Sequence, residues 1–344
     1  MKAEGVKAVA FGGGHGLWAT LRALRALAGV EITAVVTVAD DGGSSGRLRA
    51  ERGSLPPGDL RQALAALAAA DDSGELSSRL FQHRFSGDDA LGGHAVGNLV
   101  LVGLLELVGD PVAALEHAGR MLRAQGRVLP MSRVPLSIEA DVLGADPARP
   151  GDVAEVRGQH EVAVTAGRVR EVRLTPAAPP ACAEAIAAVA DADWLLFGPG
   201  SWYTSVIPHL LVPDLADAIA KTDARRLVIL NLAEEAETAG LSLADHLRAL
   251  SLHAADLRLD AVLADGLAVA DPEPVRLAAE SLSARLVLAP VAAAGERARH
   301  DPAALAAALQ PILGSDDGSV LARSVAGAAC SDTADEAVQP EVNN

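Results

Sequence analysis

Two adjacent carboxylates, Asp40 and Asp41, follow an apolar run and precede a Gly-Gly-Ser-Ser-Gly segment that contains Ser44 and Ser45, after which two arginines appear. Neighbouring carboxylates repel each other and small residues contribute little packing, so the needs of folding do not explain this pattern. If the apolar run is a strand, its carboxyl end favours the binding of a polar ligand, with the arginines available for an anion. A flexible surface loop is the alternative, because Gly- and Ser-rich stretches are commonly loops.

A glycine cluster ends the preceding predicted strand. Where a strand passes into a helix, free N–H groups and the helix dipole bind anions, and glycine lets a phosphate approach closely. The segment from Gly14 to Ala19 also fits the dinucleotide pattern G-x-G-x-x-A, which is weak evidence alone because chance matches are common. We therefore expect a phosphate-binding turn made of Gly12, Gly13, Gly14, His15 and Gly16.

Asp40 and Asp41 admit three roles. In a dinucleotide-binding fold, a carboxylate at this strand end binds ribose hydroxyls, although the spacing from the glycines is slightly longer here than usual. The pair would also suit a divalent metal such as Mg²⁺ beside a diphosphate. The third role is to keep a loop solvated. We favour a polar ligand first and a metal held by Asp40 and Asp41 second.

Two further groups of polar residues lie on predicted helices. Arg61 follows Asp59, the predicted cap of a helix to Ala70, and the helix dipole disfavours a cation there. A bound anion would offset that cost, whereas solvation of Arg61 or pairing with Asp59 is the alternative. His94 and Asn98 are four residues apart on the most apolar predicted helix, at residues 93–108. They form either an internal hydrogen bond of the core or, after two glycines, part of a site.

A second glycine turn follows a short apolar strand, has hydroxyl side chains after it, and precedes a strand that ends at Asn231. Ligands of open parallel sheets collect outside the carboxyl ends of the strands, so we expect these segments to share one rim. The predicted ligand-binding residues are Gly12, Gly13, Gly14, His15, Gly16, Asp40, Asp41, Ser44, Ser45, Arg61, His94, Asn98, Gly198, Gly200, Ser201, Tyr203, Thr204 and Asn231.

The elements that position these residues alternate between strand and helix, which predicts an α/β fold with a Rossmann-like, doubly wound parallel sheet. Strands are expected at residues 7–11, 31–38, 194–197, 226–231, 261–264 and 286–288. Helices are expected at residues 17–28, 59–70, 93–108, 111–124, 181–190, 217–221, 243–251 and 302–313. Alternating segments at residues 136–142, 161–165 and 168–174 predict a small antiparallel β insertion at 129–176. We expect one domain over residues 1–313 and a disordered tail over 314–344.

The composition narrows the class of protein. The chain has 344 residues and a net charge of −16, which opposes non-specific binding to nucleic acid or to an anionic membrane. The two cysteines are far apart and form neither a disulfide framework nor a metal cluster, so a reducing compartment is expected. The N-terminus shows no signal-peptide pattern, and the longest apolar run is too short to span a bilayer. A soluble cytoplasmic protein follows as the prediction.

Several motifs, in order, resemble those of the gluconeogenesis factor family, bacterial cytoplasmic proteins related to the 2-phospho-L-lactate transferases of deazaflavin-coenzyme synthesis. The resemblance covers roughly residues 5–290, and its most specific motif is Ala-Asp-Asp-Gly-Gly-Ser-Ser-Gly-Arg-Leu-Arg. It implies a Rossmann-like fold that binds a nucleotide-sugar, notably UDP-N-acetylglucosamine, through the predicted residues, and a regulatory role in cell shape during gluconeogenic growth. The motifs occupy residues 12–16, 37–49, 56–61, 80–85, 93–99 and 198–208.

The chain departs from that family at two places. His15 stands where many members have Thr, which adds a pH-sensitive donor beside a phosphate. After Asn231 the usual Met-Thr-Gln-Pro-Gly-Glu-Thr is replaced by a segment in which only Glu237 and Thr238 match. Contacts made by the missing Gln-Pro-Gly turn are therefore not expected here.

Three functions remain open from the sequence. A non-enzymatic nucleotide-sugar binding regulator is favoured, because cradle-like loops occur without an evident nucleophile. A Mg²⁺-dependent transferase of the 2-phospho-L-lactate transferase type, acting on a nucleotide diphosphate, is second. A nicotinamide-dependent oxidoreductase is third, because no hydride-transfer partner is evident. The sequence leaves open whether the protein forms a homo-oligomer.

Overall fold

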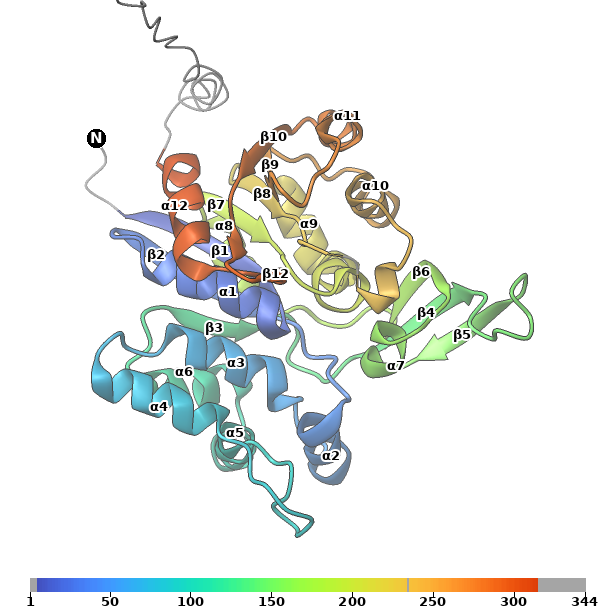
Figure 1. Cartoon of the computed structure of the whole chain (residues 1–344). Helices are drawn as coiled ribbons and strands as arrows, with labels where there is room; N and C mark the ends of the chain where they lie inside the picture. Colours follow the sequence, from blue (N-terminus) through green and yellow to red (C-terminus); the bar gives the residue numbers. More distant parts are fainter. Residues whose placement is uncertain (1–4, 234, 315–344) are drawn as a thin grey trace, which may run out of the picture.

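A parallel β-sheet forms the centre of the protein (Figure 1). The computed structural model describes residues 5–233 and 235–314. In this part of the chain, seven parallel strands lie in the order β10-β9-β8-β7-β1-β2-β3. Their bounds are β1 Val6–Gly12, β2 Val30–Val36, β3 Arg127–Pro130, β7 Trp194–Phe197, β8 Arg225–Ile229, β9 Ala261–Asp265 and β10 Arg285–Ala289.

The strand order reverses between β1 and β7. From β1 the chain moves outward through β2 to β3, and it then returns to β7 on the other side of β1 before it moves outward again. This double winding is the arrangement of Rossmann-like folds, and the predicted fold class is confirmed. At the reversal, Phe11 of β1 stacks on Phe197 of β7 with ring centres 4.8 Å apart.

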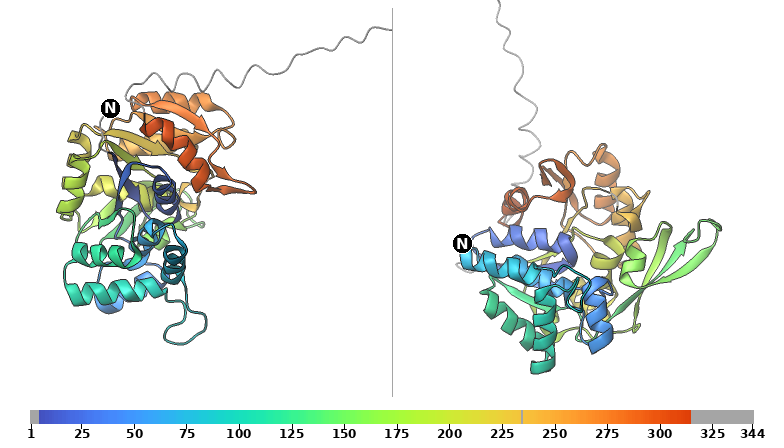
Figure 2. Two further views of the ribbon diagram at one scale, coloured as in Figure 1. Left: turned by 90° about the vertical axis from the view of Figure 1, so that its left-hand side faces the viewer. Right: turned by 60° about the horizontal axis from the view of Figure 1, so that its bottom comes forward.

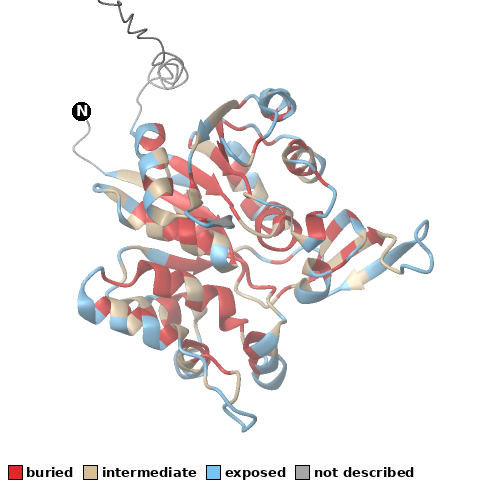
Figure 3. Cartoon of the chain, viewed as in Figure 1, coloured by how far each residue is buried: buried red, intermediate tan, exposed pale blue. Residues whose placement is uncertain are grey.

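Helices cover both faces of the sheet. Helix α1 (Gly14–Arg25) packs against α3 (Pro57–Leu67) and α12 (Pro302–Leu313) on the near face in Figure 1, while α8 (Ala183–Ala190) and α9 (Pro213–Lys221) pack together behind it. Figure 3 shows that the inner strands of the main sheet and the inward helix faces are buried. The other α-helices of the main body are α2 Gly43–Arg52, α4 Asp72–Gln82, α5 Val96–Val108, α6 Pro111–Leu122, α10 Leu243–His253 and α11 Pro272–Ser281.

A small antiparallel sheet projects from the main body, as Figure 2 also shows. We call it the β lobe: β4 (Ser137–Leu143), β5 (Val153–Arg157), β6 (Arg168–Thr175) and the short helix α7 (Gln159–Ala163). The predicted insertion is confirmed with two corrections. It begins after Pro130, because β3 pairs in parallel with β2. The strand predicted at residues 161–165 is wrong, because the chain there forms α7 and a turn.

Other predicted segments also need correction. The Gly-Gly-Ser-Ser-Gly segment is not a flexible loop, since α2 begins at Gly43. Helices α4 and α11, and a hairpin of β11 (Ala292–Ala293) with β12 (Glu296–His300), were not predicted. The described residues of both chain halves share the main sheet, whereas residues 315–344 of the predicted tail lie outside the described part. None of the described helices has the length and hydropathy needed to cross a membrane.

Candidate functional site

Two glycine turns meet where the strand order reverses. Gly12 ends β1 and Gly198 follows β7, the neighbour of β1 in the sheet. In the first turn of α1, Gly16 approaches the second turn so closely that a Cβ atom on it would lie 2.0 Å from the carbonyl oxygen of Pro199. This position therefore requires glycine. A reversal of strand order leaves a crevice outside the carboxyl ends of the two strands, which is where such sheets bind ligands.

Asn231 connects the second turn to the end of β8. Its side chain is 5% exposed. Its Oδ1 accepts a hydrogen bond from the Gly200 N–H at 2.8 Å, and its Nδ2 donates to the Gly200 carbonyl at 3.0 Å. Gly200 has a φ of 135°, which favours glycine. Asn231 thus holds the turn in shape through both ends of its amide.

Replacing Asn231 by Ala is expected to lower the free energy of unfolding by about 1–3 kcal/mol, because two polar groups of the partly buried Gly200 lose their partners. Urea denaturation followed by circular dichroism measures the change. Asn231→Asp retains an acceptor for the Gly200 N–H but places a carboxylate oxygen against the Gly200 carbonyl, so it should also lower the free energy of unfolding. Equal stability of Asn231→Ala and wild type would show that the reciprocal bond does not hold the turn.

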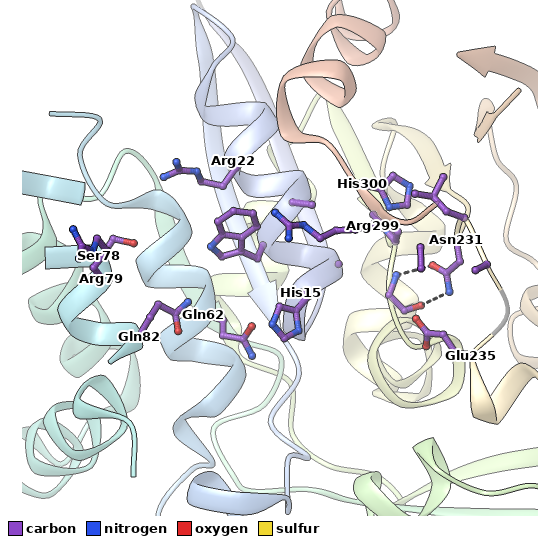
Figure 4. A pocket seen from close by; sticks show the side chains of 18 of the residues that line it. His15, Arg22, Gln62, Ser78, Arg79, Gln82, Asn231, Glu235, Arg299 and His300 are labelled. Carbon is purple, nitrogen blue, oxygen red and sulfur yellow. Dashed lines mark hydrogen bonds between the residues drawn. The ribbon is translucent and has the colours of Figure 1, made fainter. Parts of the chain in front are cut away.

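A pocket of about 490 Å³ opens beside these turns; we call it the switch-point pocket (Figure 4). One wall comes from α1, α3 and α4, and the other from the segment after β8 and from β12. Four predicted residues line it: His15, Gly16, Gly200 and Asn231. Sequence analysis missed the lining residues Trp18, Arg22, Gln62, Glu75, Ser78, Arg79, Gln82, Glu235, Arg299 and His300.

Some of the missed residues had a local signal. His15, Trp18 and Arg22 are spaced three and four positions apart and therefore share one face of α1. Once His15 was singled out, this spacing pointed to the other two. Residues on α4, such as Arg79, had no such signal because α4 itself was not predicted.

The switch-point pocket combines several kinds of binding group. Arg22 lies over the Trp18 ring, 5.4 Å from its centre, and donates to Glu75 at 2.8 Å. Burial raises the pKa of Glu235, against a hydrogen bond from Ser201. Burial lowers the pKa of His300 to about 4, so that this imidazole is neutral at pH 7. Aromatic, amide, carboxylate and guanidinium groups converging on one pocket suit a polar ligand with a ring, hydroxyls and phosphates.

Asp59 and Asp40 form a pair of carboxylates beside the first glycine turn; we call it the acid pair. Asp59 is buried; its Oδ1 accepts the Gly14 N–H at 3.0 Å, while its Oδ2 has no hydrogen-bond partner. Burial and the charge of Asp40 raise the pKa of Asp59 to about 7. Burial likewise raises the pKa of Asp40, which accepts the Gly42 N–H at 2.9 Å. The two carboxylates repel each other, and a shared proton or cation would relieve that repulsion.

Asp59 was missed as a site residue because it was interpreted as a helix cap. That prediction is wrong: the N-cap of α3 is Pro56, and Asp59 lies inside the first turn. Asp41 accepts the His160 N–H of the β lobe at 2.9 Å, and the metal pair of Asp40 and Asp41 stays a prediction. Asp41 therefore anchors the lobe to the end of β2, and Asp59 is the buried partner of Asp40.

A chain of buried side chains connects α2, α3 and α5. Arg61 Nε donates to Asn98 Oδ1 at 2.8 Å, Asn98 Nδ2 donates to Ser44 Oγ at 3.0 Å, and Ser44 Oγ lies 3.0 Å from His94 Nδ1. Ser45 Oγ accepts the Gly58 N–H at 3.0 Å. His94 precedes α5, so the prediction of a shared helix face with Asn98 is wrong, yet both contact Ser44. These bonds explain why a Gly- and Ser-rich segment is helical here.

A second hollow, of about 840 Å³, lies along α2; we call it the α2 pocket. Asp41 and Ser44 line it, together with Arg47 and Arg84. Tyr203 and Thr204 line neither pocket, because they are buried in the turn Trp202–Val206, where the Tyr203 N–H donates to Glu237 at 2.9 Å. Four predicted residues thus line the switch-point pocket, Asp41 and Ser44 line the α2 pocket, and Asp40 belongs to the acid pair; the others line neither pocket. The contact of all of them with a ligand stays a prediction.

Comparison with known proteins shows which family the chain resembles. The family model of the 2-phospho-L-lactate transferase CofD matches residues 8–288. A protein of Mycobacterium tuberculosis, whose name describes it as a candidate gluconeogenesis factor, is 51% identical over 315 residues, which cover 90% of this chain and 91% of that protein. The gluconeogenesis factor of Bacillus subtilis is 38% identical over 82% of this chain and 84% of its own length.

A solved structure supports the same relationship. The crystal structure of a UPF0052 family member from Bacillus halodurans has a TM-score of 0.78 and 33% sequence identity. The match covers 89% of this chain and 99% of that one.

Proposed function

Because the chain belongs to the family of the 2-phospho-L-lactate transferase CofD, with gluconeogenesis factors among its relatives, we propose that its switch-point pocket binds a nucleotide-sugar, specifically UDP-N-acetylglucosamine. One observation carries this proposal: two glycine turns touch at the reversal of strand order and form the edge of a pocket. Backbone N–H groups at the start of α1 suit a diphosphate.

The lining of the pocket supports the rest of such a ligand. Trp18 presents an aromatic surface for a base, and Gln62 and Gln82 supply amide groups for its polar edge. Glu235 offers a carboxylate for ribose or sugar hydroxyls. The volume of about 490 Å³ lies within the range typical of small-molecule sites.

We further propose that the protein is a cytoplasmic regulator of cell shape during growth on gluconeogenic carbon sources. The names of the relatives support the link to gluconeogenesis. The net charge of −16 supports a small-molecule partner and disfavours nucleic acid or an anionic membrane. A regulator of this kind needs no catalytic step, since ligand binding alone changes which conformations are populated.

UDP-N-acetylglucosamine is expected to bind the full chain saturably, with a Kd below about 1 mM, or about −4.1 kcal/mol. Isothermal titration calorimetry measures it. Arg79→Ala in the pocket should weaken binding at least fivefold. The same substitution at Arg120, which is also exposed but lies on α6, should leave binding unchanged. Absence of binding at millimolar ligand, or equal losses in both variants, would refute the proposal.

The acid pair favours one alternative, a Mg²⁺-dependent transferase that acts on a nucleotide diphosphate. The buried Asp59 Oδ2 lacks a hydrogen-bond partner, which fits a metal ligand. Among the described residues, no group of three metal-ligating side chains occurs, so phosphate oxygens and water would complete the coordination, as is usual for Mg²⁺. Bound there, the cation would neutralise charge on the diphosphate, while Asp40 and Asp59 hold it beside Gly14.

A further inference from the structure

We propose that the α2 pocket is a second ligand site, which binds the phosphate group of a small phosphorylated molecule through Arg47 and Arg84. This site is separate from the switch-point pocket, and the proposal stands whether or not that pocket binds a nucleotide-sugar. The two pockets share no lining residue.

The two arginines face one hollow from different elements. Arg47 lies on α2 and its Nη2 donates to the Gly92 carbonyl at 2.8 Å; Arg84 follows α4 and its Nη1 donates to the Gly93 carbonyl at 2.5 Å. Each bond uses one of the five N–H donors of a guanidinium, so most donors remain available. These carbonyl bonds hold the guanidinium groups in place, which reduces the entropy lost on binding an anion.

The charge of these arginines is not neutralised by an adjacent carboxylate. Elsewhere on the surface, arginines such as Arg133 and Arg173 bind carboxylates directly. Among the described residues, no ion pair joins Arg47 or Arg84 to an acidic side chain. In a chain of net charge −16, two guanidinium groups without an ion pair outnumber the single carboxylate of Asp41 in this hollow and mark a local anion site.

The floor of the pocket adds positive potential. The first N–H groups of a helix have no intrahelical acceptor, and in α2, which begins at Gly43, no N-cap side chain accepts from them. Behind them, the buried bonds from Ser44 to His94 and Asn98 fix this helix end against α5, and Asn98 connects it to Arg61, which is 5% exposed.

The surrounding titratable groups agree with an electropositive hollow. Burial, Arg47 and Arg84 together lower the pKa of His94, against an opposing effect of Glu51. Asp41 also lines the pocket and brings one negative charge, and its Oδ1 accepts the His160 N–H. Two guanidinium groups and a helix N-terminus match a phosphate dianion better than a single carboxylate, because each adds a donor to a doubly charged group.

Glycerol 3-phosphate is the probe, titrated into the full chain at constant ionic strength with acetate as the monoanion control. We expect glycerol 3-phosphate to bind the wild type saturably and to bind Arg84→Ala and Arg47→Ala at least tenfold more weakly. Acetate should bind the wild type far more weakly than glycerol 3-phosphate does. Arg79→Ala, an exposed arginine of the switch-point pocket, is the matched control and should leave this binding unchanged. Circular dichroism confirms that each variant is folded.

The Arg79 and Arg84 variants distinguish ligand binding at the two sites. UDP-N-acetylglucosamine binding should respond to Arg79→Ala and not to Arg84→Ala, whereas glycerol 3-phosphate should show the reverse. Hydrogen exchange with glycerol 3-phosphate should slow at residues 43–47 and 92–98. Three results would each overturn the proposal. They are loss of glycerol 3-phosphate binding in Arg79→Ala alone, unchanged binding in both α2-pocket variants, and no binding to the wild type at about 10 mM ligand.

Discussion

Asp59→Asn is expected to raise the free energy of unfolding at pH 8 by about 2–4 kcal/mol, an increase that disappears near pH 4. Burial and Asp40 raise the pKa of Asp59 to about 7, against about 3.9 in an unfolded chain. The folded state therefore binds this proton more tightly than the unfolded state. The contribution of this proton to the free energy of unfolding is fully present below pH 4. It is lost as the pH rises toward and through 7.

Urea denaturation at pH 4, 6 and 8, in buffer with EDTA, measures this difference between wild type and Asp59→Asn. Comparing the two proteins matters because burial raises the pKa of Glu237 to about 8, which adds a pH dependence common to both. Asn retains an acceptor for the Gly14 N–H, so the first glycine turn keeps its bond. A stability difference that does not vary with pH would show that Asp59 is ionised normally.

Asp71→Asn is the matched control, with the same chemical change at an exposed site. Asp71 caps α4, and its hydrogen bonds to Arg123 and to the Gly74 N–H lower its pKa. Its contribution therefore has the opposite sign: it is present above the unfolded pKa and lost as the pH falls. Asp71→Asn should not stabilise the protein at pH 8.

The same Asp59 variant separates the two proposed functions. If the acid pair holds Mg²⁺ for a transferase, Mg²⁺ should stabilise wild type at pH 8 and tighten nucleotide-sugar binding, and Asp59→Asn should lose both effects. If the protein is a regulator without a metal, Mg²⁺ should leave affinity unchanged in both proteins.

The second large effect is expected at the contact between the glycine turns. Gly16→Ala should lower the free energy of unfolding by about 1–3 kcal/mol and weaken nucleotide-sugar binding at least tenfold. The added Cβ atom would lie 2.0 Å from the Pro199 carbonyl oxygen and 2.7 Å from Gly200 Cα, so one turn must move. Because both are backbone atoms, no side chain can rotate away to relieve the contact.

Gly103→Ala is the control for this substitution. Gly103 lies within α5 with no atom within 4 Å of an added Cβ, so alanine should stabilise this helix by up to about 1 kcal/mol. Denaturation curves and calorimetry compare the two variants. Similar stability and affinity of Gly16→Ala and Gly103→Ala would mean that the two turns do not need their close contact.

Local sequence patterns predicted most strands of the main sheet and most of the helices that cover it. Strand β7 was predicted with its observed bounds, Trp194–Phe197, because a buried strand of a parallel sheet is a continuous apolar run ended by a glycine turn. Helix α2 was not predicted, because glycine and serine have low helix propensity and its stability comes from distant partners of Ser44 and Ser45.

The sequence by itself determined the Rossmann-like class, the β lobe and the strand ends at which polar residues gather, because hydrophobic periodicity and glycine punctuation are local properties. Only the tertiary structure decided which of those residues meet. It joined Asp59 to Gly14, 45 positions earlier, and placed only some of the predicted residues in the two pockets. The physical reason is that strand order and helix packing bring distant residues into contact, and nothing in a local pattern carries that information.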